Sequence, residues 1–163
     1  IEDPMTTTRS ELPLALRSAY MALHRRSEVV FGEQGVTADQ FVLLATLSRG
    51  QALTQRELAR RMPSDPSTVR AMLVLLEQRG LVQRDVHPTD SRARTVALSP
   101  EGKKKFRQLW TAGEPIRAQM VETLEPDEVE TLVNLLTKVA QSLNLERGPN
   151  GGESSEPTEK VAT

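Results

Sequence analysis

The stretch that decides the fold spans residues 54–98 and reads TQRELARRMPSDPSTVRAMLVLLEQRGLVQRDVHPTDSRARTVAL. Its first residues, Thr54-Gln55-Arg56-Glu57, have the spacing of a capping box and predict a short helix through Arg61. Asp65-Pro66 then predicts the start of a second helix, with aspartate as the N-cap and proline at the first helical position. The second helix is expected to end before Gly80, so only a tight turn joins the two helices.

Two short strand-like runs follow, at residues 81–86 and 95–98. Between them lies the polar segment HPTDSRAR (residues 87–94), which predicts a β-hairpin with a long basic tip. Two helices joined by a tight turn and followed by a hairpin are typical of a winged helix-turn-helix. In that arrangement the second helix lies in the major groove of duplex DNA and the hairpin forms the wing.

Helical periodicity extends on both sides of this stretch. A helix is expected over about residues 11–31, with Ser10 as its N-cap, and another over about 126–145. Thr37-Ala38-Asp39-Gln40 has capping-box spacing and predicts a helix in front of the winged motif. The expected fold class is therefore mostly α with a small β-hairpin wing (α+β), in which a winged helix-turn-helix lobe is joined to a helical dimerisation region.

One more helix is expected between the wing and the last helix. Ser99-Pro100 predicts its start, and the apolar pattern continues to about residue 123. Gly113 and Pro115 should bend or interrupt it, because proline removes a backbone donor and glycine weakens a helix interior.

The ends of the chain are interpreted separately from the fold. Residues 1–4 precede Met5 and are interpreted as a possible cloning scar. Residues 148–163 lack large apolar side chains and are expected to be a disordered tail. The remainder, residues 5–147, is expected to form a single domain, with the winged helix-turn-helix at about 37–98.

The charge of the chain is unevenly distributed. The formal net charge of the 163 residues is −1, but residues 49–107 hold thirteen basic and six acidic side chains. A locally basic segment in a near-neutral chain indicates a surface that binds a polyanion. The alternative is a solvated surface on which basic residues cluster by chance.

Composition excludes several functional classes. The chain has no cysteine, so disulfides, thiol catalysis, thiol sensing and cysteine metal sites are absent. Two histidines are too few for a histidine-rich metal site, and no phosphate loop or catalytic triad is evident. We therefore expect no enzyme, no cofactor and no bound metal. No apolar run is long enough to span a bilayer and no signal peptide is visible, so we expect a cytoplasmic protein.

Candidate DNA contacts lie on the second helix and on the wing. Arg70 is the candidate for a bidentate contact with guanine, and Arg92 at the hairpin tip can enter the minor groove. Asp90 is expected to orient the wing by holding the guanidinium of Arg92. The alternatives are an ordinary exposed helix charge and a solvated turn. The full set of candidate contacts is Ser64, Ser67, Thr68, Arg70, Thr89, Arg92 and Arg94.

Several segments together resemble the MarR (multiple-antibiotic-resistance regulator) family. They are residues 55–62, 65–69 and 76–82, the wing motif Asp90-Ser91-Arg92, and residues 96–102. The resemblance covers about residues 11–145, and the combination of segments is specific. Three places depart from the pattern of the family, namely Ala71, Val74-Leu75 and Ser91.

The resemblance implies a regulator that works as a homodimer. The helices at about 11–31, 100–123 and 126–145 match the dimerisation elements of the family. A two-fold protein reads a two-fold site, so the implied partner is a pseudo-palindromic operator in double-stranded DNA. The implied function is a ligand-responsive repressor. The alternative is a winged-helix module that contacts proteins and has no affinity for duplex DNA even at low salt.

The resemblance also implies a small effector, often an aromatic or phenolic acid. Family ligand sites lie between the dimerisation helices and the DNA-binding lobe. Candidate lining residues here are Tyr20, His24, Arg25, Phe41 and Trp110. The alternative is that the aromatic residues belong to the core or to the dimer interface, and that His24 is a structural hydrogen-bonding group.

Overall fold

The computed structural model of the protein describes residues 8–50 and 52–145. The interpretations of residues 1–4 as a scar and of 148–163 as a tail lie outside the described residues. The chain divides into two compact units, the first ending at Met120 and the second beginning at Val121. Among the described helices, none combines the length and apolar character that crossing a membrane requires.

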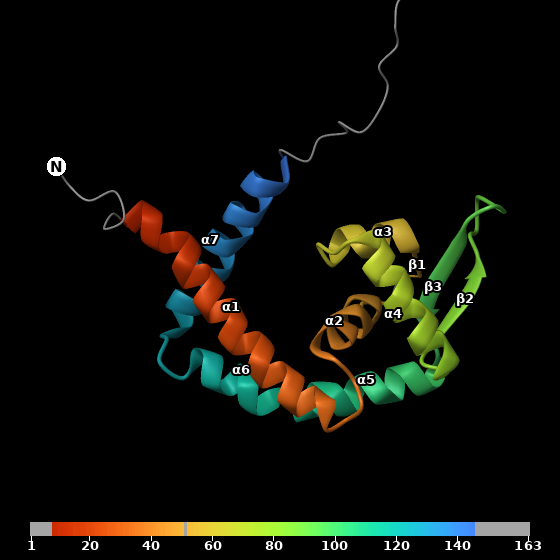
Figure 1. Ribbon diagram of the computed structural model, residues 1–163, viewed down its shortest axis with the longest axis horizontal. Coiled ribbons are helices and arrows are strands. Elements are labelled where there is room, and N and C mark those ends of the chain that lie inside the picture. The colour runs from red at the N-terminus through yellow and green to blue at the C-terminus, as the bar shows by residue number, and fades with distance from the viewer. Residues whose placement is uncertain (1–7, 51, 146–163) are drawn as a thin grey trace, which may run out of the picture. The chain divides into compact units, whose positions relative to one another are not determined.

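The described part of the chain is mostly helical and carries a small antiparallel sheet, as expected for the predicted α+β class (Figure 1). In chain order the elements are α1 (Thr8–Gly32), α2 (Ala38–Leu47), β1 (Leu53–Thr54), α3 (Gln55–Arg61), α4 (Pro66–Gln78), β2 (Val82–Val86), β3 (Arg94–Leu98), α5 (Pro100–Ala112), α6 (Glu114–Val121) and α7 (Pro126–Leu145).

The sheet has three strands rather than the two of the predicted hairpin. Its order is β1-β3-β2, with both neighbours antiparallel. The β2–β3 hairpin pairs Val82 with Leu98 at its base and Val86 with Arg94 near its tip. β1 adds Leu53 opposite Val96. This strand has only two residues and ends at the N-cap of α3, so it is too short to produce an alternating pattern in the sequence.

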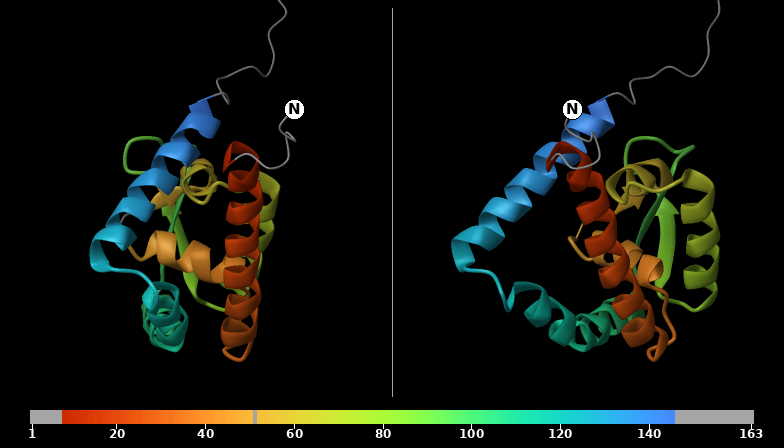
Figure 2. Two further views of the ribbon diagram at one scale, coloured as in Figure 1. Left: turned by 90° about the vertical axis from the view of Figure 1, so that its left-hand side faces the viewer. Right: turned by 60° about the vertical axis from the view of Figure 1, so that its left-hand side comes forward.

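The core of the first unit fills the space between the helices and the sheet. α4 contributes the fully buried Val69, Leu73 and Leu76, which recur at helical spacing. α3 contributes Leu58, and Leu109 of α5 is also fully buried. Figure 2 shows α2 and α4 packed beside the sheet, so the inward side of α4 is fixed by the core and its other side faces outward.

The predicted helix starts at Thr37, Thr54 and Asp65 are confirmed. Thr37 and Gln40 form a reciprocal capping box, in which the Gln40 amide donates to Thr37 Oγ1 at 3.0 Å. Thr54 and Glu57 form the second box, and Glu57 Oε2 accepts the Thr54 backbone N–H at 2.8 Å. These side chains satisfy amides that the first turn of a helix leaves without an intrahelical partner.

One predicted helix start is wrong, and one predicted helix interruption is confirmed. Ser10 is not an N-cap, because α1 already begins at Thr8 and includes it. The segment 100–123 forms two helices, α5 and α6, as the predicted interruption allowed. The break falls at Gly113, where an added Cβ would lie 3.2 Å from the ring of Phe31. A glycine at this position therefore lets the α5–α6 junction pass close to α1.

Replacing Glu57 by glutamine is expected to lower the stability of the protein near neutral pH. Hydrogen bonds from the backbone and then the hydroxyl of Thr54 hold the pKa of Glu57 below its ordinary value of 4.5. Because folding lowers this pKa, the ionised group stabilises the fold above the unfolded value, and the contribution is lost as pH falls through the folded value.

The measurement is urea unfolding of wild type and Glu57→Gln between about pH 7 and about pH 3. The stability difference between them should shrink toward acid. Glu33→Gln is the control, because the carboxylate of Glu33 accepts no hydrogen bond from a described residue. A difference that stays constant across the range would contradict this account of the cap.

Candidate nucleic-acid interface

The N-terminus of α4 holds two of the predicted contact residues, Ser67 and Thr68, in one hydrogen-bonded group with the N-cap Asp65. The Ser67 hydroxyl and the Thr68 amide both donate to Asp65 Oδ2, the latter at 3.1 Å. These hydrogen bonds lower the pKa of Asp65 from its ordinary value of 3.8, and the bond from the Ser67 hydroxyl has the largest effect. Ser67 and Thr68 are exposed, so their hydroxyls stand in fixed positions at the start of the helix.

Ser64 is placed less favourably than Ser67 and Thr68. It lies in the turn between α3 and α4, is only partly exposed, and donates its backbone N–H to the Ala59 carbonyl at 3.0 Å. That bond closes the turn and sets the angle at which α4 leaves α3. The backbone of Ser64 therefore shapes the turn of the helix-turn-helix, and this role does not depend on what the Ser64 hydroxyl binds.

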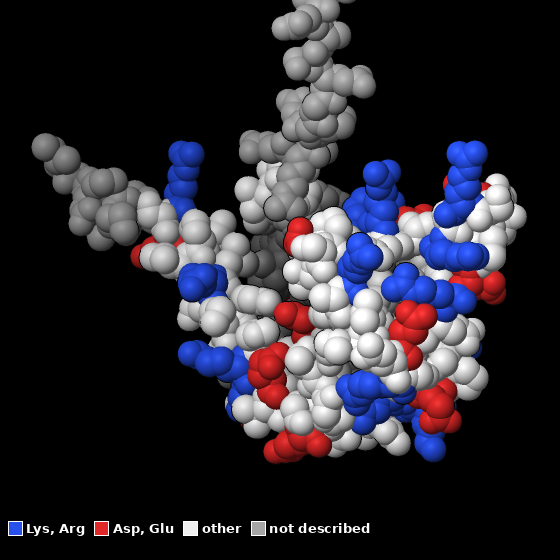
Figure 3. All heavy atoms as spheres, turned by 45° about the vertical axis from the view of Figure 1, so that its right-hand side comes forward, with Lys and Arg blue, Asp and Glu red and all other residues white. Residues whose placement is uncertain are grey.

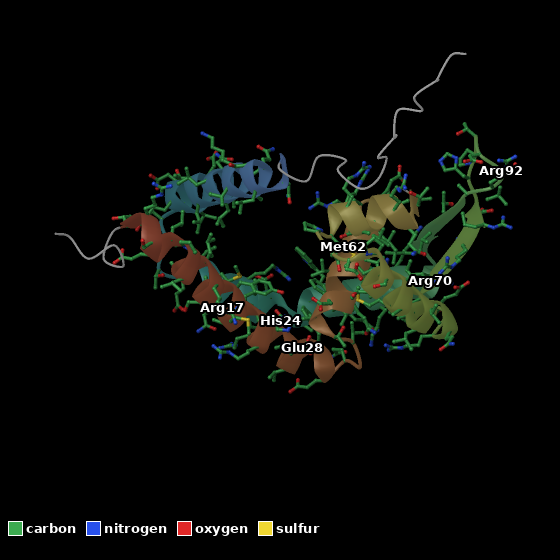
Figure 4. All side chains as sticks on the ribbon, turned by 45° about the horizontal axis from the view of Figure 1, so that its top comes forward. Arg17, His24, Glu28, Met62, Arg70 and Arg92 are labelled. Carbon is green, nitrogen blue, oxygen red and sulfur yellow. The ribbon has the colours of Figure 1, made fainter. Side chains whose placement is uncertain are left out.

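Arg70 projects from the outward side of α4, as labelled in Figure 4. Its neighbour Val69 is buried in the core, which fixes the rotation of the helix. No described residue accepts a hydrogen bond from the Arg70 guanidinium or pairs with its charge. A planar donor group without a protein partner is available for bidentate contact with guanine or for a phosphate.

The tip of the hairpin is shaped by His87, a residue to which the sequence prediction assigned no role. Its Nδ1 accepts the backbone N–H groups of Thr89 and Asp90, each at 3.2 Å. The Thr89 hydroxyl also lies 3.2 Å from this nitrogen. The Ala93 amide donates to the Asp90 carbonyl at 3.1 Å and closes the turn. In the sequence, the only sign of this role for His87 was the turn-forming composition of residues 87–94.

Asp90 orients the wing by a contact other than the predicted one. Its Oδ1 accepts the backbone N–H of Arg92 at 3.0 Å, and no described carboxylate pairs with the Arg92 guanidinium. An aspartate side chain readily bonds an amide two residues later, because this closes a turn-like ring. Asp90 thus fixes the backbone at Arg92 and leaves the guanidinium free.

The two wing arginines occupy different positions in the hairpin. Arg92 lies in the loop at the tip (Figure 4), whereas Arg94 is the first residue of β3 and pairs with Val86. Both side chains are exposed, and neither guanidinium bonds a described residue. The structure therefore presents two arginine side chains without a described partner at the end of the two-stranded hairpin.

The basic excess of residues 49–107 is divided between two surfaces. In the view of Figure 3, Lys and Arg side chains gather at the upper right of the molecule, over α3 and the hairpin. The cluster Lys103-Lys104-Lys105 with Arg107 belongs instead to α5, at the far end of the lobe from the hairpin tip (Figure 1). Arg107 and Lys103 line a separate groove of about 400 Å³ beside the end of α2. The net positive charge of residues 49–107 is therefore larger than the positive charge that lies near α4.

A second candidate site is a cavity of about 180 Å³ among α1, α2, α5 and α6, and all its lining residues belong to the first unit. Four of the five predicted ligand residues line it, namely Tyr20, His24, Phe41 and Trp110, and its walls are mostly apolar. The rings of Tyr20 and His24 stack with centroids 5.7 Å apart.

Arg117, rather than the predicted Arg25, supplies the cation of this cavity. Arg25 is exposed on α1 and does not line it. The Arg117 guanidinium carbon lies 3.7 Å from the centroid of the Trp110 ring, and the group donates to the Trp110 carbonyl at 2.6 Å. It also pairs with Glu114 at 2.7 Å, so the cation is held against one wall of the cavity.

Comparison with known proteins gives a consistent result. The sequence profile of the MarR family matches residues 36–93. The HTH-type transcriptional repressor MdtR of Bacillus subtilis is 28% identical over 141 residues, covering 86% of this chain and 91% of MdtR. The multiple antibiotic resistance protein MarR of Salmonella typhimurium is 30% identical over 105 residues, covering 64% of this chain and 73% of that protein.

Solved structures extend the comparison to the fold. Apo MarR from Escherichia coli superimposes with a TM-score of 0.68 at 27% identity, covering 78% of this chain and 96% of MarR. A mutant of that protein complexed with operator DNA gives a TM-score of 0.73 at 26% identity, covering 85% and 99%. Sequence, fold and the exposed basic residues of α4 and the hairpin agree, and the chain therefore belongs to the MarR family and is a DNA-binding transcription regulator rather than an enzyme.

Proposed function

We propose that this protein is a ligand-responsive, cytoplasmic repressor that binds a pseudo-palindromic operator as a homodimer. The observation that carries the DNA-binding surface is the pair of free guanidinium groups on one lobe, Arg70 on α4 and Arg92 on the wing. α4 enters the major groove with its N-terminus toward the backbone, and Arg92 reaches the adjacent minor groove.

The N-terminus of α4 supports this docking. Its first amides carry partial positive charge and face outward with the exposed Ser67 and Thr68. The hydroxyls that now bond Asp65 can exchange that acceptor for a phosphate oxygen. A solved relative complexed with operator DNA has the same fold at 26% identity. This likeness supports the assignment of α4 and the wing as the surface that binds DNA in this protein.

Exposed apolar residues support the homodimer. Within the second unit, α7 exposes large apolar side chains at Leu132, Leu136 and Leu143, spaced at about one and two helical turns. Within the first unit, α1 exposes Leu12 and Leu14. Such surfaces on a small protein mark association sites. We assign α1, α5, α6 and α7 to the dimer interface, and a two-fold dimer spaces its two α4 helices for two half-sites.

The cavity beside Trp110 supports an effector. It combines aromatic walls with the polar groups of His24 and Arg117, a set suited to an aromatic or phenolic carboxylic acid. α2 contributes Phe41 to the cavity and also packs against the core beneath α4. A ligand that shifts α2 would therefore shift α4 in its groove and release the operator.

Arg70→Ala is expected to weaken binding to the operator by roughly 1 to 3 kcal/mol and to relax the sequence preference at one base pair of each half-site. Arg70→Lys should keep the nonspecific affinity and lose the preference, because lysine carries the charge without the bidentate fork. The measurement is a gel-shift titration against duplexes with each base at that position. Unchanged preference in both variants would place Arg70 outside the interface.

Trp110→Ala is expected to abolish stabilisation of the protein by its effector. A thermal-shift screen of aromatic and phenolic carboxylates should raise the unfolding midpoint of wild type but not of the variant, and the active compounds should weaken DNA binding. Arg25→Ala is the control, because Arg25 lies outside the cavity. A compound that stabilises wild type and Trp110→Ala equally would show that it binds elsewhere.

The proposed function as a whole is tested by selecting bound duplexes from a genomic pool at low salt. The expected product is a set of related sites with two inverted half-sites whose centres lie one helical turn of about 10 base pairs, or a multiple of it, apart. A protein-interaction module would recover no duplex even at low salt, where phosphate contacts are strongest.

A further inference from the structure

The side of α4 that points away from the core has an apolar centre. The buried residues Val69, Met72, Leu73 and Leu76 define the inward direction. At about 100° per residue, the opposite direction passes through Ser67, Ala71, Val74 and Gln78. Val74 stands in the middle of this line and is 42% exposed. Arg70 lies to one side of it.

Val74 is close enough to the candidate polar contacts to share one half-site with them. It follows Ser67 by roughly two turns, which is about 10 Å along the helix axis. That distance corresponds to about three base-pair steps of 3.4 Å. A helix seated in the major groove by Ser67 and Arg70 therefore carries Val74 over neighbouring base edges.

The chemistry of the groove restricts what Val74 can face. Each base presents hydrogen-bonding groups in the major groove, and thymine alone also presents a methyl group, at C5. An isopropyl group that covers an amino or carbonyl group removes water and returns no hydrogen bond, which is unfavourable. Covering a methyl group is favourable, because apolar surface leaves water on both sides.

We propose that Val74 is a specificity-determining residue that selects a thymine methyl group in each half-site. The inference rests on the proposed docking of α4 in the major groove. It adds a base preference that Arg70 does not supply, so each half-site combines a guanine read by Arg70 with a thymine read by Val74. The methyl group of Ala71, one turn earlier on the same line, extends the apolar contact.

The test replaces each thymine of the selected duplex in turn by deoxyuridine, which lacks only the C5-methyl group. For wild type, one position in each half-site should lose about fourfold in affinity, the value for burial of one methyl group at ~0.8 kcal/mol. In Val74→Ala the penalty at that position should fall toward onefold. The measurement is fluorescence anisotropy with the full chain.

A matched control is Val42→Ala without any effector present, which removes the same two methyl groups from a valine of α2 that is exposed to nearly the same degree, 43%. Its ratio of thymine to uracil affinity should equal that of wild type. The inference is overturned if no thymine position is sensitive to deoxyuridine, or if the sensitivity is the same in Val74→Ala as in wild type. Failure to select any duplex would instead overturn the proposed function, so the two failures are distinguishable.

Discussion

Replacing both Arg92 and Arg94 by alanine is expected to lower the affinity for the selected operator by about 30- to 20,000-fold. Each arginine that contacts DNA contributes roughly 1 to 3 kcal/mol, and the two are removed together. The fold should be unchanged, because neither guanidinium bonds a described residue and the wing is shaped by His87 and Asp90. The measurement is anisotropy titration at several salt concentrations.

The salt dependence separates this surface from general charge. The double variant should show a shallower dependence of affinity on salt, because fewer counterions are released from DNA. The control is Lys103→Ala with Lys104→Ala, which removes the same charge from α5. Equal losses in the two double variants would mean that the wing acts only through net charge.

Gly102→Ala is expected to cause a large loss of stability. A Cβ at this position would lie 1.8 Å from the carbonyl oxygen of Leu81 and 2.9 Å from its carbonyl carbon. The clash is with backbone, so it cannot be relieved by a side-chain rotation. The first turn of α5 is also fixed there, since Ser99 Oγ accepts the Gly102 amide at 2.9 Å and the Ser99 hydroxyl donates to the Gly80 carbonyl at 2.5 Å.

The expected cost of Gly102→Ala is about 3 kcal/mol or more, the upper part of the range for overpacking. For a domain of this size that lowers the unfolding midpoint by roughly 6 to 12 °C. Gly32→Ala is the matched control, because an added Cβ there meets nothing within 4 Å. A midpoint for Gly102→Ala within a degree or two of that control would contradict the close approach of α5 to the α4–β2 turn.

Local signals made most of the fold predictable. The residues that begin α2, α3 and α4 act through hydrogen bonds to amides two or three positions away, so the sequence contains the whole interaction. β1 was missed because its two residues are strand only by virtue of pairing with β3, more than forty positions later. The start of α1 was placed late because a serine suggested a cap that the longer helix does not use.

The sequence predicted which residues belong to the candidate sites better than it predicted where their side chains point and what they bond. Arg25 is adjacent to His24 in sequence, but a step of about 100° along α1 turns it away from the cavity. Arg117 reaches the cavity from α6, beyond the break at Gly113, and periodicity alone does not show where a broken helix points. Asp90 has both a guanidinium and an amide within plausible reach at Arg92, and only the folded turn shows that it bonds the amide.

The central claim is that α4 and the hairpin wing form the surface that binds DNA. Amide hydrogen exchange of the full chain, with and without the selected duplex, tests it most directly. The account predicts that duplex DNA slows exchange at residues 66–75 of α4 and at the wing tip, residues 87–93, with little change along residues 103–107 of α5. Protection confined to α5, or no protection in a complex that demonstrably forms, would contradict it.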